Sequence, residues 1–129
     1  MTDLQDALDE VIVRGLEDWL MAASVVSVAI HTAGAETDDE VRDVSVALIR
    51  RLLEDGLVRA GDVTDSGFEP WDLPVDAAME RVEREWNALG ALPNLGEVCW
   101  LDNTEEGERR ARELLQNRRQ DGAAPPADR

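Results

Sequence analysis

The chain has 129 residues, which is the size of one globular domain and too small for a two-domain enzyme. It carries 29 acidic residues against 13 basic ones, and the resulting formal net charge of -16 makes nucleic acid an unfavourable direct partner. Hydrophobic residues make up 43% of the chain, which is too many for a disordered acidic tail. These numbers predict one folded, acidic domain.

The first third of the chain predicts two helices. Apolar residues recur at helical spacing from about residue 3, and Gly15 is expected to end this first helix. Asp18 is expected to cap a second helix, whose apolar face begins at Trp19. The β-branched residues 25–30 are also compatible with a strand, but the length of the apolar segment favours a helix.

A third helix and a hairpin follow. Thr37 or Asp38 is expected to cap a helix that ends at Gly56, and the carboxylates in its first turn suit the positive end of the helix dipole. Two short extended segments around a polar turn then predict a β-hairpin over residues 57–71.

The remaining elements are two helices with a strand between them. Pro74 suits the first turn of a helix that stops near Gly90, and residues 97–101 predict a short buried strand. Thr104 is expected to cap the last helix, which extends through Leu115.

No repeat and no shift in composition divides the chain. Residues 3–118 are therefore expected to form a single domain of the mainly α class, more fully α+β with a small hairpin or sheet. Residues 119–129 lack apolar periodicity and are expected to form a disordered C-terminal tail.

The segment 46–59 is an apolar helix that ends in Glu-Asp-Gly-Leu-Val, and it resembles the second half of a winged-helix domain. In that family such a helix passes directly into the wing, so the resemblance implies that the hairpin of residues 57–71 is the wing. Residues 98–109 are similar to the strand, threonine cap and start of the final helix in many such domains. The resemblance covers about half of the chain and implies a winged-helix-like fold.

A second resemblance concerns residues 68–74 and the Glu-Arg-Glu-Trp sequence at 83–86, which look like a group of small actinobacterial proteins. Acidic proteins of this size resemble the immunity proteins of polymorphic and contact-dependent toxin systems. This resemblance implies a non-enzymatic protein that binds and neutralises a toxin.

The charge pattern opposes DNA binding, the commonest winged-helix function. A DNA-binding winged helix would insert the helix of residues 38–55 into the major groove. Residues 38–59 hold six acids and four arginines, and residues 61–100 hold nine acids and two arginines. Such a surface gains little counterion release from phosphates. A transcriptional regulator, or a regulator-derived domain that binds DNA or protein, is therefore kept as the alternative.

The same charges suit a basic protein partner, because an acidic domain can mask a cationic cleft and associate quickly through long-range attraction. A basic toxin domain, for example a nuclease, is the expected partner. The candidate partner-binding residues are acids at the start of the third helix and around the hairpin, with one tryptophan as an aromatic anchor. They are Asp38, Asp39, Glu40, Asp43, Asp62, Asp65, Glu69, Trp71 and Asp72.

Two simpler interpretations of the acids stay open. The carboxylates could form only a solvated face, with those of the first helical turn serving the helix dipole. All 13 basic residues are arginine, so the acidic excess could also reflect salt adaptation. Among the tryptophans, Trp19, Trp86 and Trp100 fall on apolar stripes and are expected in the core, whereas Trp71 lies in a proline-flanked loop and is expected to be exposed.

Catalytic and metal-binding patterns are missing from the sequence. His31 is the only histidine, and Cys99 lies in an apolar segment where an inert buried thiol is expected. No spacing matches a calcium loop or a phosphate-binding loop. We therefore expect no enzymatic activity, no metal and no cofactor. With one cysteine, no signal segment and no apolar run of the roughly 20 residues that a membrane span needs, a cytoplasmic protein is expected.

Overall fold

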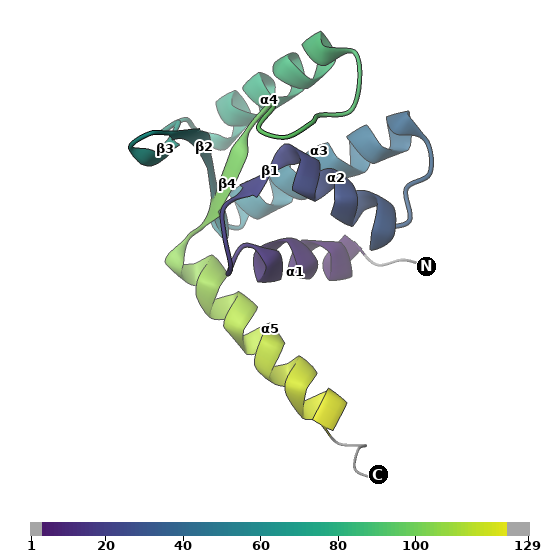
Figure 1. Cartoon of the computed structure of the whole chain (residues 1–129), viewed down its shortest axis with the longest axis vertical. Coiled ribbons are helices and arrows are strands. Elements are labelled where there is room, and N and C mark those ends of the chain that lie inside the picture. Colours follow the sequence, from purple (N-terminus) through teal and green to yellow (C-terminus); the bar gives the residue numbers. More distant parts are fainter. Residues whose placement is uncertain (1–3, 124–129) are drawn as a thin grey trace.

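The computed structural model describes residues 4–123, which form five helices and four strands (Figure 1). The helices are α1 (Leu4–Arg14), α2 (Ala22–His31), α3 (Asp38–Glu54), α4 (Val75–Leu89) and α5 (Glu105–Ala123). The strands are β1 (Leu20–Met21), β2 (Val58–Thr64), β3 (Gly67–Pro70) and β4 (Trp100–Asn103). The mainly helical α+β class expected from the sequence is confirmed.

The strands form one antiparallel sheet in the order β1-β4-β2-β3. The last strand in the chain, β4, therefore lies in the interior of the sheet, where Leu101 pairs with Leu20 on one side and with Ala60 on the other. This arrangement joins the beginning, middle and end of the domain. Strands β2 and β3 form the expected hairpin, and Val63 pairs with Phe68 across it.

The hydrophobic core lies between the helices and one face of the sheet. Its largest fully buried side chains include Ile12 of α1, Leu48 of α3 and Met79 of α4, together with Leu101 of β4. These three helices thus turn an apolar stripe inward, as their sequence spacing predicts. Within residues 4–123 we find no helix with the length and apolar character to cross a membrane.

The ends of α3 and α4 follow the local signals in the sequence. Thr37 caps α3 by accepting the Glu40 backbone N–H at 3.1 Å, and the Glu40 carboxylate accepts the Thr37 N–H in return. Helix α3 ends before Gly56 and α4 before Gly90, and both glycines have the left-handed backbone that glycine favours.

Helix α2 begins later than predicted. Its N-cap is Met21, because Leu20 and Met21 are drawn into the sheet by pairing with β4. Asp18 therefore does not cap the helix, and its carboxylate accepts the Trp19 backbone N–H at 2.7 Å instead. The prediction that residues 25–30 are helical is confirmed.

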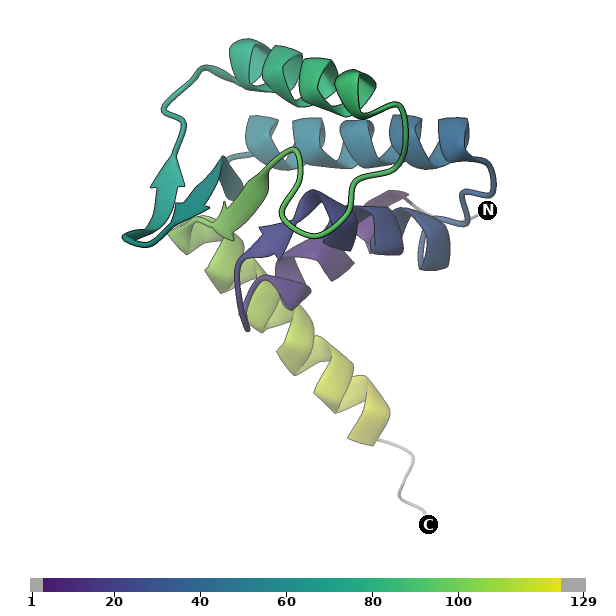
Figure 2. The ribbon, with the colours of Figure 1, turned by 45° about the horizontal axis from the view of Figure 1, so that its top comes forward.

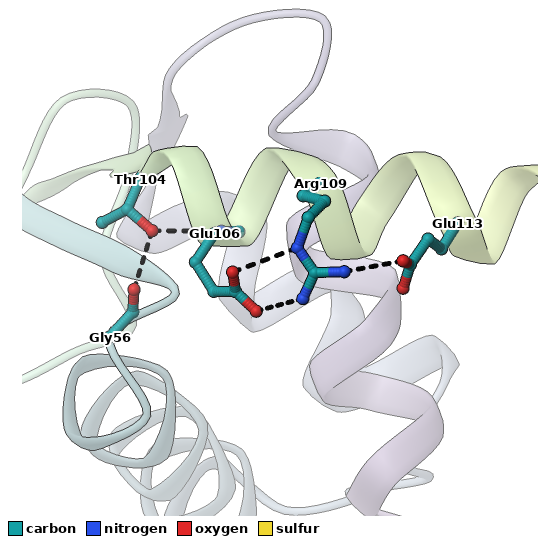
Figure 3. Close-up of polar contacts among 6 residues, drawn as sticks. Gly56, Thr104, Glu106, Arg109 and Glu113 are labelled. Carbon is teal, nitrogen blue, oxygen red and sulfur yellow. Dashed lines mark hydrogen bonds and ion pairs between the residues drawn. The ribbon is translucent and has the colours of Figure 1, made fainter.

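Helix α5 is anchored at its first turn. The Thr104 hydroxyl accepts the Gly107 N–H at 3.0 Å and donates to the Gly56 carbonyl at 2.7 Å, which ties this helix to the end of α3 (Figure 3). The helix continues to Ala123, so residues 119–123 are helical rather than part of a tail. Residues 124–129 of the expected tail lie outside the described residues.

Candidate functional site

The structure divides the predicted acidic residues into two separate groups. The α3 cluster consists of Asp38, Asp39, Glu40 and Asp43 at the N-terminal end of α3. The hairpin cluster consists of Asp62, Asp65, Glu69 and Asp72, which follow the other end of that helix. The 17 residues of α3 span about 25 Å, so one small binding site cannot include both clusters. Figure 2 shows the hairpin and the start of α3 on opposite sides of the domain.

Within the α3 cluster, two of the four carboxylates already have partners. The Glu40 carboxylate accepts the Glu36 N–H at 2.9 Å as well as the Thr37 N–H, and these hydrogen bonds lower the pKa of Glu40. Asp43 lies 3.2 Å from Arg42, whose guanidinium also reaches α4. The exposed Asp38 and Asp39 remain, and they line a shallow cleft of about 320 Å³ against the end of α4.

In the hairpin cluster too, some carboxylates have partners within the chain and others do not. Asp62 forms an ion pair with Arg81 of α4 at 3.5 Å, and Glu69 accepts the Thr64 hydroxyl at 3.0 Å. Asp65 is exposed at the turn of the hairpin. Asp72 has a left-handed backbone, with φ of 56°, and lines a cleft of about 230 Å³ between the hairpin and α4.

Trp71 is not an exposed anchor. It packs against the core, and its backbone N–H donates to the Ala60 carbonyl at 3.0 Å. The Arg81 guanidinium lies over the indole ring, 4.0 Å from the centroid, and the indole N–H is buried without a hydrogen-bond acceptor among residues 4–123. The exposed tryptophan is instead Trp19, with 38% of its surface accessible, so the predicted positions of these two tryptophans are wrong. Trp100, also predicted in the core, is half-buried and lies outside the core cluster, whereas Trp86 is buried as predicted.

Most of the positive charge is neutralised within the chain. Residues 4–119 hold 12 arginines and 26 acids, and the following ten arginines lie within 4.0 Å of a carboxylate of this chain. They are Arg14, Arg42, Arg50, Arg51, Arg59, Arg81, Arg109, Arg110, Arg112 and Arg118. The uncompensated charge of the described surface is therefore negative.

Sequence reasoning missed an aromatic surface on the sheet. The ring centroids of Trp19 and Phe68 lie 6.2 Å apart, and the Arg59 guanidinium lies 5.2 Å from the Phe68 centroid. Arg59 also forms an ion pair with Asp102 on the neighbouring strand. Because side chains alternate along a strand, residues 59, 61 and 63 of β2 are expected to share one face of the sheet. That pattern does not reveal that Trp19 lies on the same face.

The one thiol has no reactive environment. Cys99 is buried, and burial raises the pKa of its thiol to about 12, with the negative charges of Glu85 and Asp62 adding to the effect. His31 is exposed at the end of α2. Among the described residues, no group of three or more histidine, cysteine or acidic side chains is placed to hold a metal ion.

Comparison with models of protein families, with curated protein sequences and with solved structures finds no match for this chain. The winged-helix and immunity-protein resemblances therefore rest on the sequence motifs alone and stay predictions.

Proposed function

We propose that this protein is a non-enzymatic binding protein that neutralises a basic protein partner, and that the partner is a toxin domain. One observation supports this proposal most: ten arginines pair with carboxylates of the same chain. The remaining acids have no such partner, so the excess charge on the surface is negative. Such a surface attracts a cationic protein over long distances and speeds association.

The same pairing argues against the alternative of a DNA-binding regulator. In α3, Arg42, Arg50 and Arg51 all have carboxylate partners, and the hydrogen bond from Arg50 to Asp76 at 3.1 Å raises the pKa of the arginine. A bound phosphate would have to displace these carboxylates, which would then face the phosphate as like charges. The counterion release that drives DNA binding would be small.

The proposal is tested with the product of the gene adjacent to the one that encodes this chain. We expect a complex of nanomolar affinity that weakens steeply with salt, and rescue of cells that express the adjacent gene as a toxin. Retention of this protein on non-specific duplex DNA at about 150 mM salt, with no binding to the adjacent product, would instead support the regulator.

Charge reversal of Asp38, Asp39 and Asp43 to lysine tests whether the α3 cluster contributes to this attraction. We expect slower association, because every negative charge removed from the domain weakens its long-range attraction for a basic partner. The control reverses three exposed acids elsewhere on the domain, namely Asp6, Glu80 and Glu105, and changes the net charge equally. An association rate that depends only on net charge would place the contact surface away from the α3 cluster.

A further inference from the structure

The sheet has a second face, which is turned away from the core. Side chains alternate along β2, so Val58 and Ala60 are buried among the helices whereas Arg59 projects to the opposite side. Cross-strand pairing places Trp100 beside Gly61 and Phe68 beside Val63 on that opposite side. In Figure 2 no helix lies in front of the four strands.

An aromatic surface covers this face. A Cβ on Gly61 would lie 2.8 Å from the Phe68 ring, so glycine lets that ring lie down over β2. Trp19 packs beside it, and a Cβ on Gly67 would be 3.9 Å from the indole. We define the outer sheet face by Trp19, Arg59, Phe68, Trp100 and Asp102.

The loop before β4 extends this apolar surface. The Gly96 N–H points to the Met21 sulfur at 3.1 Å, and a Cβ on Gly96 would lie 3.9 Å from the Trp100 ring. Leu95 in the same loop is 79% exposed, the highest value among the exposed large apolar side chains in the described residues. Exposed apolar side chains rimmed by polar groups are typical of a protein interaction site.

The charges around the outer sheet face identify its partner as cationic. Arg59 shows the mode of recognition within the chain itself, because its guanidinium lies over Phe68 and pairs with the Asp102 carboxylate. Trp19 offers the same combination without an internal cation, since the exposed Glu17 and Asp18 precede it and have no arginine within 4.0 Å in the described residues. Asp65, at the adjacent hairpin turn, adds a third such carboxylate.

We infer that the outer sheet face is the docking surface for the basic partner, with Trp19 receiving an arginine or lysine side chain of that partner between its ring and the carboxylates of Glu17, Asp18 and Asp65. This inference rests on the proposed function and specifies its contact surface. The aromatic anchor is then Trp19 in place of the Trp71 expected from the sequence. Of the hairpin cluster, only Asp65 belongs to this interface.

The test uses a nona-arginine peptide as a cationic probe at 150 mM NaCl, with the NMR signals of the four indole N–H groups as reporters. We expect the Trp19 signal to shift on titration while that of the buried Trp86 stays in place. Trp19→Ala should weaken binding at least roughly fivefold. Leu89→Ala removes an apolar side chain of similar exposure, 37%, from the last turn of α4, and should change the affinity less than twofold.

Other outcomes separate failure of this inference from failure of the proposed function. One such outcome is that the peptide binds, that the double variant Asp38→Asn/Asp39→Asn weakens this binding, and that Trp19→Ala does not. The outer sheet face is then not the docking surface, but the affinity for a basic partner stands. If the unmodified protein binds neither nona-arginine nor the product of the adjacent gene, both are refuted. If sedimentation shows a dimer that Trp19→Ala dissociates, a second copy occupies the face and the inference is overturned.

Discussion

Replacement of Gly107 by alanine tests how closely α5 approaches the rest of the domain. Gly107 lies in the first turn of α5, and its N–H donates to the Thr104 hydroxyl. A Cβ at this position would lie 2.0 Å from the Leu57 carbonyl oxygen, which itself accepts the Thr104 N–H at 3.0 Å. The added methyl group therefore meets backbone that cannot rotate away.

The expected effect is opposite in sign to the one that helix propensity suggests. In an unobstructed helix, alanine is more favourable than glycine by about 1 kcal/mol. Here the start of α5 must move by about 1 Å to restore van der Waals separation, which strains two hydrogen bonds of Thr104, to Leu57 and Gly56. Overpacking costs about 1–3 kcal/mol and each weakened hydrogen bond about 1 kcal/mol. These costs, less the gain in helix propensity, lead us to expect that Gly107→Ala is destabilised by about 2–4 kcal/mol.

Urea unfolding at pH 7, followed by far-ultraviolet circular dichroism, measures this difference from the midpoint at a common m-value. The control is Asn117→Ala on the exposed surface of α5, which should be neutral or stabilised by about 0.5 kcal/mol. Gly107→Ala with stability equal to or above that of the unmodified protein would refute the close approach of α5 to Leu57.

Three further predictions concern stability. Asn103→Ala removes a buried amide that donates to the Ile12 carbonyl at 2.8 Å, and we expect a loss of about 1–3 kcal/mol in urea unfolding. Thr37→Ala removes the acceptor for the Glu40 N–H and should cost about 1 kcal/mol, whereas Thr37→Ser should retain most of the stability; equal losses in both variants would contradict the cap. Burial raises the pKa of the Cys99 thiol from its ordinary value of 9.0 to about 12 in the folded state. The unfolded state therefore loses the thiol proton first, and the free energy of unfolding should fall by up to about 1.4 kcal/mol per pH unit between pH 9 and 12. Below pH 8 the thiol is protonated in both states, so this residue should not change the free energy of unfolding. Cys99→Ala should abolish that dependence, and rapid alkylation of the native thiol at pH 8 would contradict its burial.

Local signals in the sequence predicted the ends of several elements correctly. Thr37 and Thr104 cap α3 and α5, and Gly56 and Gly90 follow the ends of α3 and α4, as expected. Each of these features depends on residues within one helical turn. The hairpin was predictable for the same reason, because its strands are separated by a turn of only two residues, Asp65 and Ser66.

Features that depend on distant pairing were not predictable. Strand β1 consists of two residues and exists because Leu20 and Met21 meet β4, about 80 residues later in the chain. That pairing also delays the start of α2 and exposes Trp19, which periodicity alone had assigned to a buried helical stripe. A local hydrophobic pattern cannot show which partner strand recruits a residue.

The candidate functional surface shows the same division between local and distant effects. The sequence by itself determined the acidic excess, the helical class and the absence of a recognisable catalytic pattern. Only the tertiary structure decided that the α3 cluster and the hairpin cluster lie apart and that most arginines form ion pairs within the chain. It also decided that Trp19 packs beside Phe68 on the outer sheet face. The physical reason is that charge and hydrophobicity are properties of single residues, whereas pairing and exposure depend on which distant residues the folded chain brings within a few ångströms.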